Sequence, residues 1–282
     1  MTAYPSDRPA VCMLSLLLLW SCPGCHAEPM PADPPGMTPE APPIPRAGAG
    51  AGAGAGPTTA EGWLDRIEAA ADDIDTLTAR VRLTQIVGLL EDESQRFGEL
   101  RVSTADDATR FRVRFDRLRQ DGVVEPIAQT YVYDGRWLLD LDGTDRVATR
   151  RQLVRGDAAA DLELGDGPFL LPLNLKKDRV LQRFTAELGE LDDTAPDPPT
   201  GDGVVRLVLT PRPGFDADAE RLDLWFDTGS DLPLRATATQ DDGDITTVDL
   251  FRLDPAAEVD SSVFDTALPA DPGWETQVVE LD

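Results

Sequence analysis

From residue 77 to residue 279 the sequence repeats one pattern: short runs in which apolar and polar residues alternate, separated by turns rich in Asp and Gly. Alternation with a period of two is typical of a β-strand that buries one face. Asp134-Gly135 lies between two such runs and favours the tight turn that joins antiparallel strands. The pattern predicts about ten antiparallel strands in meander order. A break in the alternation at Gly98 predicts a β-bulge. The expected strands cover 77–83, 97–102, 111–115, 127–133, 137–141, 147–154, 184–191, 204–210, 221–227, 232–240 and 245–253, and 274–279 would close the set.

Two segments with helical spacing interrupt the strands. The spacing of Trp63, Ile67, Ala71 and Ile74 predicts a helix over roughly 59–74. Thr58 and Glu61 would form a capping box at its start. A second helix over 176–184 is indicated by Val180, Leu181 and Phe184. The apolar stripe of a helix needs a surface to cover. We therefore expect a mainly β protein with two helical segments, in which a curved antiparallel sheet forms an unclosed β-barrel covered by the helices.

The N-terminus holds every cysteine and the single histidine, which all precede residue 27. An apolar run over 11–20 has the length of a signal-peptide core and is too short to span a bilayer. We expect 1–27 to be an export signal, 28–57 a disordered linker rich in Pro and in alternating Ala and Gly, and 58–282 one folded domain. The signal either ends in a lipidated cysteine, with Cys22 and Cys25 as the candidates, or is removed by ordinary cleavage; the alternative is an apolar N-terminus that is never cleaved.

The folded part lacks the residues of most enzyme sites. With no Cys or His after residue 26, it has no thiol nucleophile, no His base and no His/Cys metal site. Asp140, Asp142 and Gly143 resemble part of a calcium loop, but the distal Glu is missing and Asp-Gly is expected in a hairpin turn. A net charge of −26 disfavours nucleic acid as a partner. We therefore expect no enzyme, no cofactor and no metal.

Four segments together carry a family resemblance. They are Phe-Gly-Glu-Leu-Arg-Val at 97–102, Tyr-Asp-Gly-Arg-Trp-Leu-Leu-Asp at 133–140, Leu-Asp-Leu-Trp-Phe-Asp at 222–227, and Val-Phe, Leu-Pro and Gly-Trp within 263–274. Their order over roughly 60–280 resembles the periplasmic lipoprotein carriers of the LolA type. The resemblance implies an unclosed β-barrel with helical cover, a hydrophobic cavity for acyl chains and a periplasmic location. One departure is that the family's Arg-Pro pair, which is tied to lid closure, has no clear counterpart in the turn at 103–107.

The resemblance and the strand pattern together select candidate binding residues. The expected cavity lining comes from three strands and consists of Phe111, Val113, Phe115, Trp137, Leu139, Leu141, Leu222, Leu224 and Phe226. The expected lid or flap consists of Trp63, Ile67 and Ile74 from the first helix and Phe169, Leu170 and Leu171 from a segment rich in Gly and Pro. The alternative is that these residues fill a packed core. Arg110, Arg112 and Arg114 share the other face of their strand, either as a solvated row or as a surface for an acidic partner or a lipid phosphate.

The leading hypothesis is an exported, monomeric protein that binds acyl chains of lipids or lipoproteins and carries them between the inner and outer membranes. Membrane-bound donor and acceptor proteins would then be its partners. One alternative is an acceptor or periplasmic sensor of the same fold, anchored through Cys22 or Cys25. Another is an interaction domain with a filled core.

Overall fold

The computed structural model describes residues 56–89, 92–105, 108–155, 170–191, 199, 203–215 and 217–281. The expected export signal over 1–27, nearly all of the expected linker over 28–57, and Phe169 lie outside these residues, as do Cys22 and Cys25. No helix among the described residues has the length and apolar character needed to cross a membrane.

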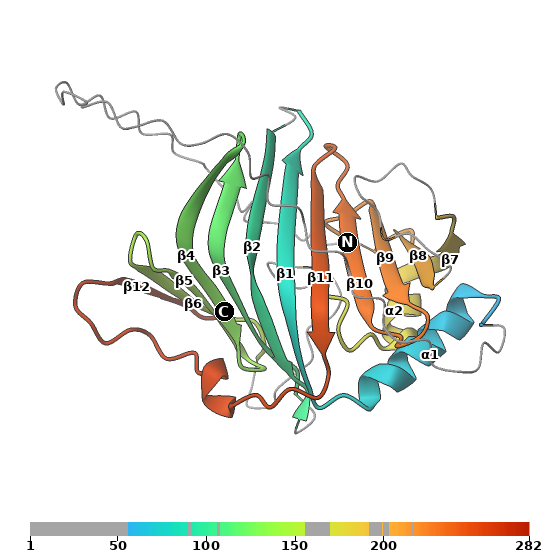
Figure 1. Ribbon diagram of the computed structural model, residues 1–282, viewed down its shortest axis with the longest axis horizontal. Helices are drawn as coiled ribbons and strands as arrows, with labels where there is room; N and C mark the ends of the chain where they lie inside the picture. Colours follow the sequence, from blue (N-terminus) through green and yellow to red (C-terminus); the bar gives the residue numbers. More distant parts are fainter. Residues whose placement is uncertain are drawn as a thin grey trace, which may run out of the picture. The chain divides into compact units, whose positions relative to one another are not determined.

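In the described part of the chain, twelve strands form a single sheet. The first six are β1 (Thr76–Val87), β2 (Asp92–Ser103), β3 (Arg110–Gln120), β4 (Val123–Tyr133), β5 (Trp137–Asp142) and β6 (Val147–Gln152). The last six are β7 (Phe184–Gly189), β8 (Val204–Pro211), β9 (Arg221–Asp227), β10 (Pro233–Thr239), β11 (Ile245–Asp254) and β12 (Glu275–Val279). The sheet is curved, and its edge strands β12 and β7 do not pair with each other (Figure 1). The expected fold class, an unclosed and helix-covered β-barrel, is confirmed.

The strand order corrects the expected single meander. The order is β12-β6-β5-β4-β3-β2-β1-β11-β10-β9-β8-β7, so two meanders meet where β1 pairs with β11. β6 and β7 follow each other in the chain but lie towards opposite ends of the sheet, and β12 pairs with β6 in parallel. Alternation predicts which residues form strands, whereas the pairing partners depend on where the long connections run.

The two helices lie on one face of the sheet. Helix α1 (Ala60–Asp72) begins one residue later than expected, because Thr59 rather than Thr58 is its N-cap. Thr59 has an extended backbone, and its side chain accepts a hydrogen bond from the N–H of Gly62 at 3.1 Å. Helix α2 (Lys177–Arg183) falls within the expected range and leads directly into β7.

The predicted bulge at Gly98 is confirmed. The register between β2 and β3 shifts between Phe97 and Gly98, where Asp116 is the extra residue on β3. A Cβ atom on Gly98 would lie 1.9 Å from the carbonyl oxygen of Arg114. Glycine is therefore required where β3 approaches β2 most closely.

The cross-strand register assigns side chains to two faces of the sheet. We call the face that carries Phe111, Tyr133 and Leu138 the inner face, because these directly paired residues share it. Two apolar clusters cover the inner face. The helix cluster consists of Ala60, Trp63, Leu64, Ile67, Leu170, Leu175, Val180, Phe184, Leu207, Leu209, Leu222, Leu224, Phe226 and Ala236. The strand cluster consists of Leu77, Ala79, Val81, Leu83, Leu100, Val102, Phe111, Val113, Phe115, Tyr133, Leu138, Val248 and Leu250.

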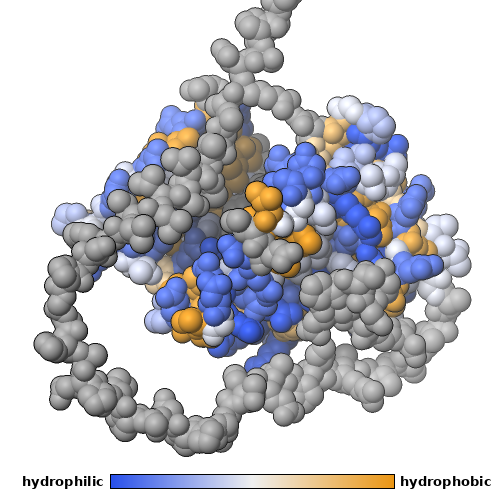
Figure 2. Space-filling model, turned by 90° about the horizontal axis from the view of Figure 1, so that it is seen from above, coloured by the Kyte–Doolittle hydropathy of each residue, from blue (hydrophilic) through white to orange (hydrophobic). Residues whose placement is uncertain are grey.

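Among the described residues, the opposite, outer face carries many charged side chains and an apolar cluster at one side. There, Val132 and Leu139 are covered by the segment 259–268, which contains the short 3₁₀ helix η2 (Ser261–Phe264). Seen from above, the described surface shows mainly hydrophilic residues with separate hydrophobic patches (Figure 2).

Candidate apolar binding site

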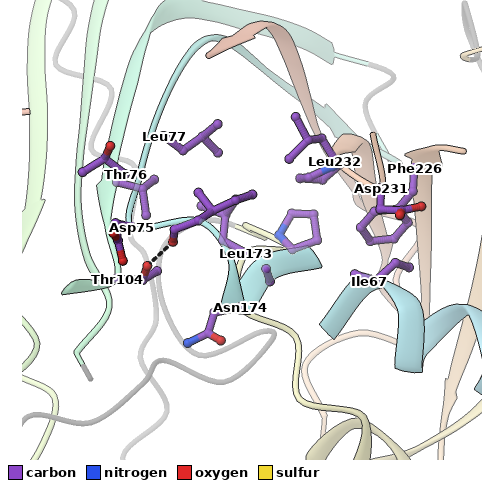
Figure 3. Close-up of a pocket in the computed structure, with 15 residues that line it drawn as sticks. Ile67, Asp75, Thr76, Leu77, Thr104, Leu173, Asn174, Phe226, Asp231 and Leu232 are labelled. Atoms are coloured by element: carbon purple, nitrogen blue, oxygen red, sulfur yellow. Dashed lines mark hydrogen bonds between the residues drawn. The ribbon is translucent and has the colours of Figure 1, made fainter. Parts of the chain in front are cut away.

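A pocket opens where α1 leaves the inner face. Its walls come from α1, the first residues of β1, the end of β2, the segment 172–174 and the turn between β9 and β10. The apolar lining consists of Ile67, Ala71, Ile74, Leu77, Val102, Pro172, Leu173, Phe226, Leu232 and Pro233. Polar groups are contributed by Asp75, Thr76, Thr104, Asn174 and Asp231. Figure 3 shows Leu77, Leu232 and Ile67 around this space, contributed by β1, the β9–β10 turn and α1.

The position of the pocket follows from how α1 is buried. The buried residues of α1 are Ala60, Trp63, Leu64 and Ile67, all in its first two turns. Ala71 in the last turn and Ile74 just after it are only partly buried and line the pocket instead. The helix is therefore anchored by its N-terminal part, and its C-terminal end covers the pocket without filling it.

Arg66 joins α1 to the β9–β10 turn. Its Nε donates to Asp231 Oδ2 at 2.8 Å, and a second guanidinium nitrogen donates to the carbonyl oxygen of Thr228 at 2.7 Å. The guanidinium carbon also lies 5.0 Å from the centroid of the Trp63 ring. Asp231 Oδ1 is buried and has no hydrogen-bond partner in the part of the chain that the structure describes. We call this set of contacts the Arg66 latch.

A second set of polar contacts joins α1 to α2. Lys177 Nζ lies 2.7 Å from an Asp65 oxygen, and the N–H of Lys177 donates to Glu68 Oε2 at 3.0 Å. The hydrogen bond to Asp65 raises the pKa of Lys177. Lys176 forms an ion pair with Asp72 in the last turn of α1. The carboxylates of Asp65 and Asp72 in these ion pairs are more than half exposed, so the pairs orient the two helices but add little stability.

Of the expected lining residues, Phe226 is the one that lines the pocket. Leu222 and Leu224 lie beneath the helices in the helix cluster and are fully buried. Phe111, Val113 and Phe115 belong to the strand cluster, where they are also buried. In that cluster Phe111 packs on Tyr133 with ring centroids 5.6 Å apart, and Phe115 meets Tyr131 edge-on at 6.5 Å.

The structure does not bring Trp137, Leu139 and Leu141 to the inner face. Tyr133 pairs with Leu138, so Leu138 points inward and its two neighbours point outward. Leu139 and Leu141 lie under the segment 259–268, and Trp137 stacks against Arg150, whose guanidinium is 4.2 Å from the ring centroid. The expectation that these three residues line the cavity was wrong by one residue of register.

The expected lid residues divide between two roles. Trp63 anchors α1 in the helix cluster, whereas Ile67 and Ile74 line the pocket. Leu170 packs into the helix cluster and Leu171 against the strand cluster. The pocket is also lined by residues that the alternation pattern did not single out as candidates, because only the sheet as a whole brings them together: Leu77, Val102, Leu232 and Pro233.

Other polar candidates have structural explanations. Asp142 accepts hydrogen bonds from the N–H groups of Thr144 and Asp145 at 2.9 and 3.0 Å, which accounts for the calcium-like turn. No group of three or more metal-ligating side chains occurs within the described ranges. Tyr131 and Asp140 lie on the inner face, where burial raises the pKa of Tyr131 to about 12 and also raises that of Asp140.

The architecture defines a class of protein: an open antiparallel half-barrel with helices on its inner face and a small apolar pocket beneath one of them. No protein-family model matches this sequence, and no curated protein is similar to it. Among solved structures, an uncharacterized conserved protein from Thermus thermophilus resembles this chain with a TM-score of 0.43. The two sequences are 16% identical, and the match covers 78% of this chain and 97% of the Thermus protein. A putative outer membrane lipoprotein-sorting protein domain from Vibrio parahaemolyticus is 10% identical, with coverage of 73% and 96% and a TM-score of 0.39. A LolA superfamily protein from Nitrosomonas europaea is 12% identical, with coverage of 74% and 98% and a TM-score of 0.34. LolA superfamily structures are thus among the structural neighbours of this chain.

Proposed function

We propose that this protein is an exported, non-enzymatic binder of apolar chains, with acyl chains of lipids or lipoproteins as the ligand class. The observation that carries the proposal is the pocket between the end of α1 and the inner face, where ten apolar side chains surround unfilled space. Burial of one CH₂ group is worth about 0.8 kcal/mol. A chain of several methylenes would therefore bind without any specific polar contact.

The pocket in this structure is a closed form of that site. Its volume is about 40 Å³, whereas sites for small organic ligands usually enclose about 300–1,000 Å³. An acyl chain can enter only if the walls move apart. The proposal therefore requires a movable wall, and the burial of each wall residue indicates which part moves.

The last turn of α1 and the segment 172–174 are the walls that can move at least cost. Removing the whole helix would expose Trp63, Leu64 and Ile67, at about 1.5–3 kcal/mol each. Ala71, Ile74 and Leu173 are only partly buried. The polar contacts at this wall include the Lys176–Asp72 ion pair and the hydrogen bond that the Thr104 hydroxyl donates to the carbonyl oxygen of Ile74. We infer that α1 stays anchored at its N-terminal half while its C-terminal end swings.

We propose export from the cytoplasm and a carrier role between membranes for the soluble form. The support is the signal-like sequence over 1–27 and the absence of any Cys or His from the rest of the chain. The alternative is an anchored acceptor or sensor with the same pocket. Mass spectrometry of the mature N-terminus distinguishes them: a diacylglyceryl group on Cys22 or Cys25 favours the anchored forms, and an unmodified start after residue 27 favours the carrier.

A filled interaction domain is the rival from another class. The observation in its favour is that the strand cluster is fully packed, with Phe115 and Tyr133 inaccessible to solvent. In that case the small pocket is a packing defect. An acyl-chain binder should show saturable binding of a fatty acid, whereas a filled interaction domain should show none.

Titration of the purified protein with a fluorescent fatty acid tests the proposal. Ala71→Trp places a large side chain in the pocket from the last turn of α1, and we expect it to weaken binding at least about tenfold. Ala69→Trp is the matched control, because Ala69 lies on the same helix, is exposed and does not line the pocket. Absence of saturable binding to the unmodified protein would leave the filled interaction domain as the better description.

A further inference from the structure

A group of arginines lies on the outer face of the central strands, away from the pocket. Arg101 on β2 pairs directly with Arg112 on β3. Arg114 on β3 pairs with Glu99 on β2, which in turn pairs with Arg80 on β1. These side chains point outward because Phe111, Val113 and Phe115 between them point inward. We call Arg80, Arg101, Arg112 and Arg114 the outer arginine cluster.

Positive charge in this cluster is only partly compensated. Glu99 is the carboxylate within it, at 2.8 Å from Arg80 and 3.9 Å from Arg101. Among the described residues, no carboxylate forms an ion pair with Arg112 or Arg114. Burial and the charges of Arg101 and Arg114 lower the pKa of Arg112, against the opposing effect of Glu99. Like charges directly opposite each other destabilise a strand pair, so the cluster would be stabilised by an anion bound between the arginines. The cluster is thus a local site for an anion on a chain whose net charge is −26.

The rest of the outer face indicates which anion fits. Asp249 contacts Arg82 at 2.9 Å and Arg235 at 2.5 Å. Asp223 likewise contacts Arg206 at 3.0 Å and Arg221 at 2.8 Å. A carboxylate between two arginines is thus the repeated arrangement on this face, and it matches the planar geometry of guanidinium groups. For Arg112 and Arg114, none of the described residues supplies such a bridging carboxylate.

The shape of the surface favours a peptide segment over a bilayer. Val132, which pairs with Arg112, is covered by the segment 259–268. This segment stands above the sheet immediately beside the cluster and would meet a flat membrane first. The acids of this segment take part in its own turns: Asp260 accepts a hydrogen bond from the N–H of Ser262 at 2.8 Å as the N-cap of η2, and Asp265 accepts one from the N–H of Ala267 at 2.9 Å. A narrow acidic chain can lie alongside the segment and reach the guanidinium groups.

We propose that the outer arginine cluster is a docking surface for an acidic segment of a partner protein, whose carboxylates complete the pairing of Arg112 and Arg114. Phe251, which is 38% exposed and pairs with Arg80, supplies an apolar contact at the side of the cluster away from Val132. Arginine next to an exposed aromatic ring is typical of protein interfaces. This surface is independent of the pocket and lies on the opposite face of the sheet.

Fluorescence anisotropy of a labelled polyglutamate peptide with the full chain tests this docking surface. We expect saturable binding at low salt that Arg112→Gln/Arg114→Gln weakens about tenfold, since two charge-assisted contacts are lost. The control is Arg119→Gln/Arg252→Gln, which removes the same charge from exposed positions outside the cluster and should change the affinity less than about twofold. Fatty-acid binding should be equal in all three proteins.

Three results overturn the proposal: no saturable peptide binding, equal weakening by the control, or binding to phosphatidylglycerol vesicles through Arg112 and Arg114 without binding to the peptide. The last would identify a membrane surface instead. Glutamine keeps the aliphatic stem over the sheet, and thermal melting followed by circular dichroism checks that the double variant is folded. If it is not, Arg114→Gln alone, at an exposed position, should still weaken peptide binding severalfold, and an unchanged affinity counts against the proposal.

Discussion

The Arg66 latch allows the proposed closed state of the pocket to be perturbed at one side chain. Arg66→Met keeps a long, helix-favouring side chain on α1 but removes the charge. The substitution eliminates the hydrogen bonds to Asp231 and to the carbonyl of Thr228, and the contact with the Trp63 ring is changed. The apolar residues that anchor α1 in the helix cluster are not themselves substituted.

The size of the effect follows from the burial of the two partners. Breaking a buried ion pair by removal of one partner costs about 3–5 kcal/mol, whereas an exposed pair is worth about 0–1 kcal/mol. The Asp231 side chain is 14% exposed and the Arg66 side chain 36% exposed, so the pair lies between these limits. We expect Arg66→Met to lower the free energy of unfolding by about 1–3 kcal/mol, because Asp231 would then have both carboxylate oxygens without a partner.

A double-mutant cycle with Asp231→Asn isolates the interaction. Asparagine suits the backbone at residue 231, where φ is +60°. Urea denaturation of the four proteins should give a coupling energy of about 1 kcal/mol. Stopped-flow mixing with a fluorescent fatty acid should show faster association for Arg66→Met, because the β9–β10 turn, which lines the pocket through Asp231, Leu232 and Pro233, is then no longer tied to α1. A coupling energy below about 0.3 kcal/mol, together with unchanged association kinetics, would show that burial alone holds the helix.

Three further predictions concern the sheet. Gly98→Ala should lower the free energy of unfolding, measured by urea denaturation, by several kcal/mol, because the new Cβ would collide with the backbone of Arg114. The control is Gly203→Ala, where the nearest atom to a new Cβ is 3.9 Å away, and this substitution should be close to neutral. Burial raises the pKa of Tyr131 from 10.0 to about 12. The neutral side chain therefore contributes stability that is fully present below pH 10.0 and is lost as the pH rises towards about 12. Denaturation across this window should show a decline that Tyr131→Phe removes, and an equal decline in both proteins would contradict the assignment. Leu139→Ala should cost about 2–5 kcal/mol by leaving a cavity under Phe264, yet fatty-acid binding should be unchanged, since Leu139 lies on the outer face.

Several elements of this fold follow from the sequence because their signals are local. Strand β9 (Arg221–Asp227) was predicted with its observed bounds, since its alternation is complete within seven residues. The bulge at Gly98 and the turn at Asp134-Gly135 also depend only on neighbouring residues. The same holds for α2, which lies inside the predicted range.

The face on which a strand buries its side chains was harder to predict in β5. Trp137, Leu139 and Leu141 alternate well, but Leu138 is apolar too, so either set can form the buried face. The turn at Asp134 decides between them, because its carboxylate accepts hydrogen bonds from Arg136 and Trp137 and so fixes the register with β4.

The sequence by itself determined that this chain forms a largely antiparallel sheet with two helices, since alternation and turn chemistry are properties of neighbouring residues. Only the tertiary structure decided that β1 pairs with β11 and that β6 and β7 lie towards opposite ends of the sheet. That arrangement brings Leu77 and Leu232, from opposite sides of the junction between the two meanders, to one pocket together with Leu173. Contacts between residues far apart in the chain depend on which long connection gives the best-buried sheet, and no local pattern encodes that choice.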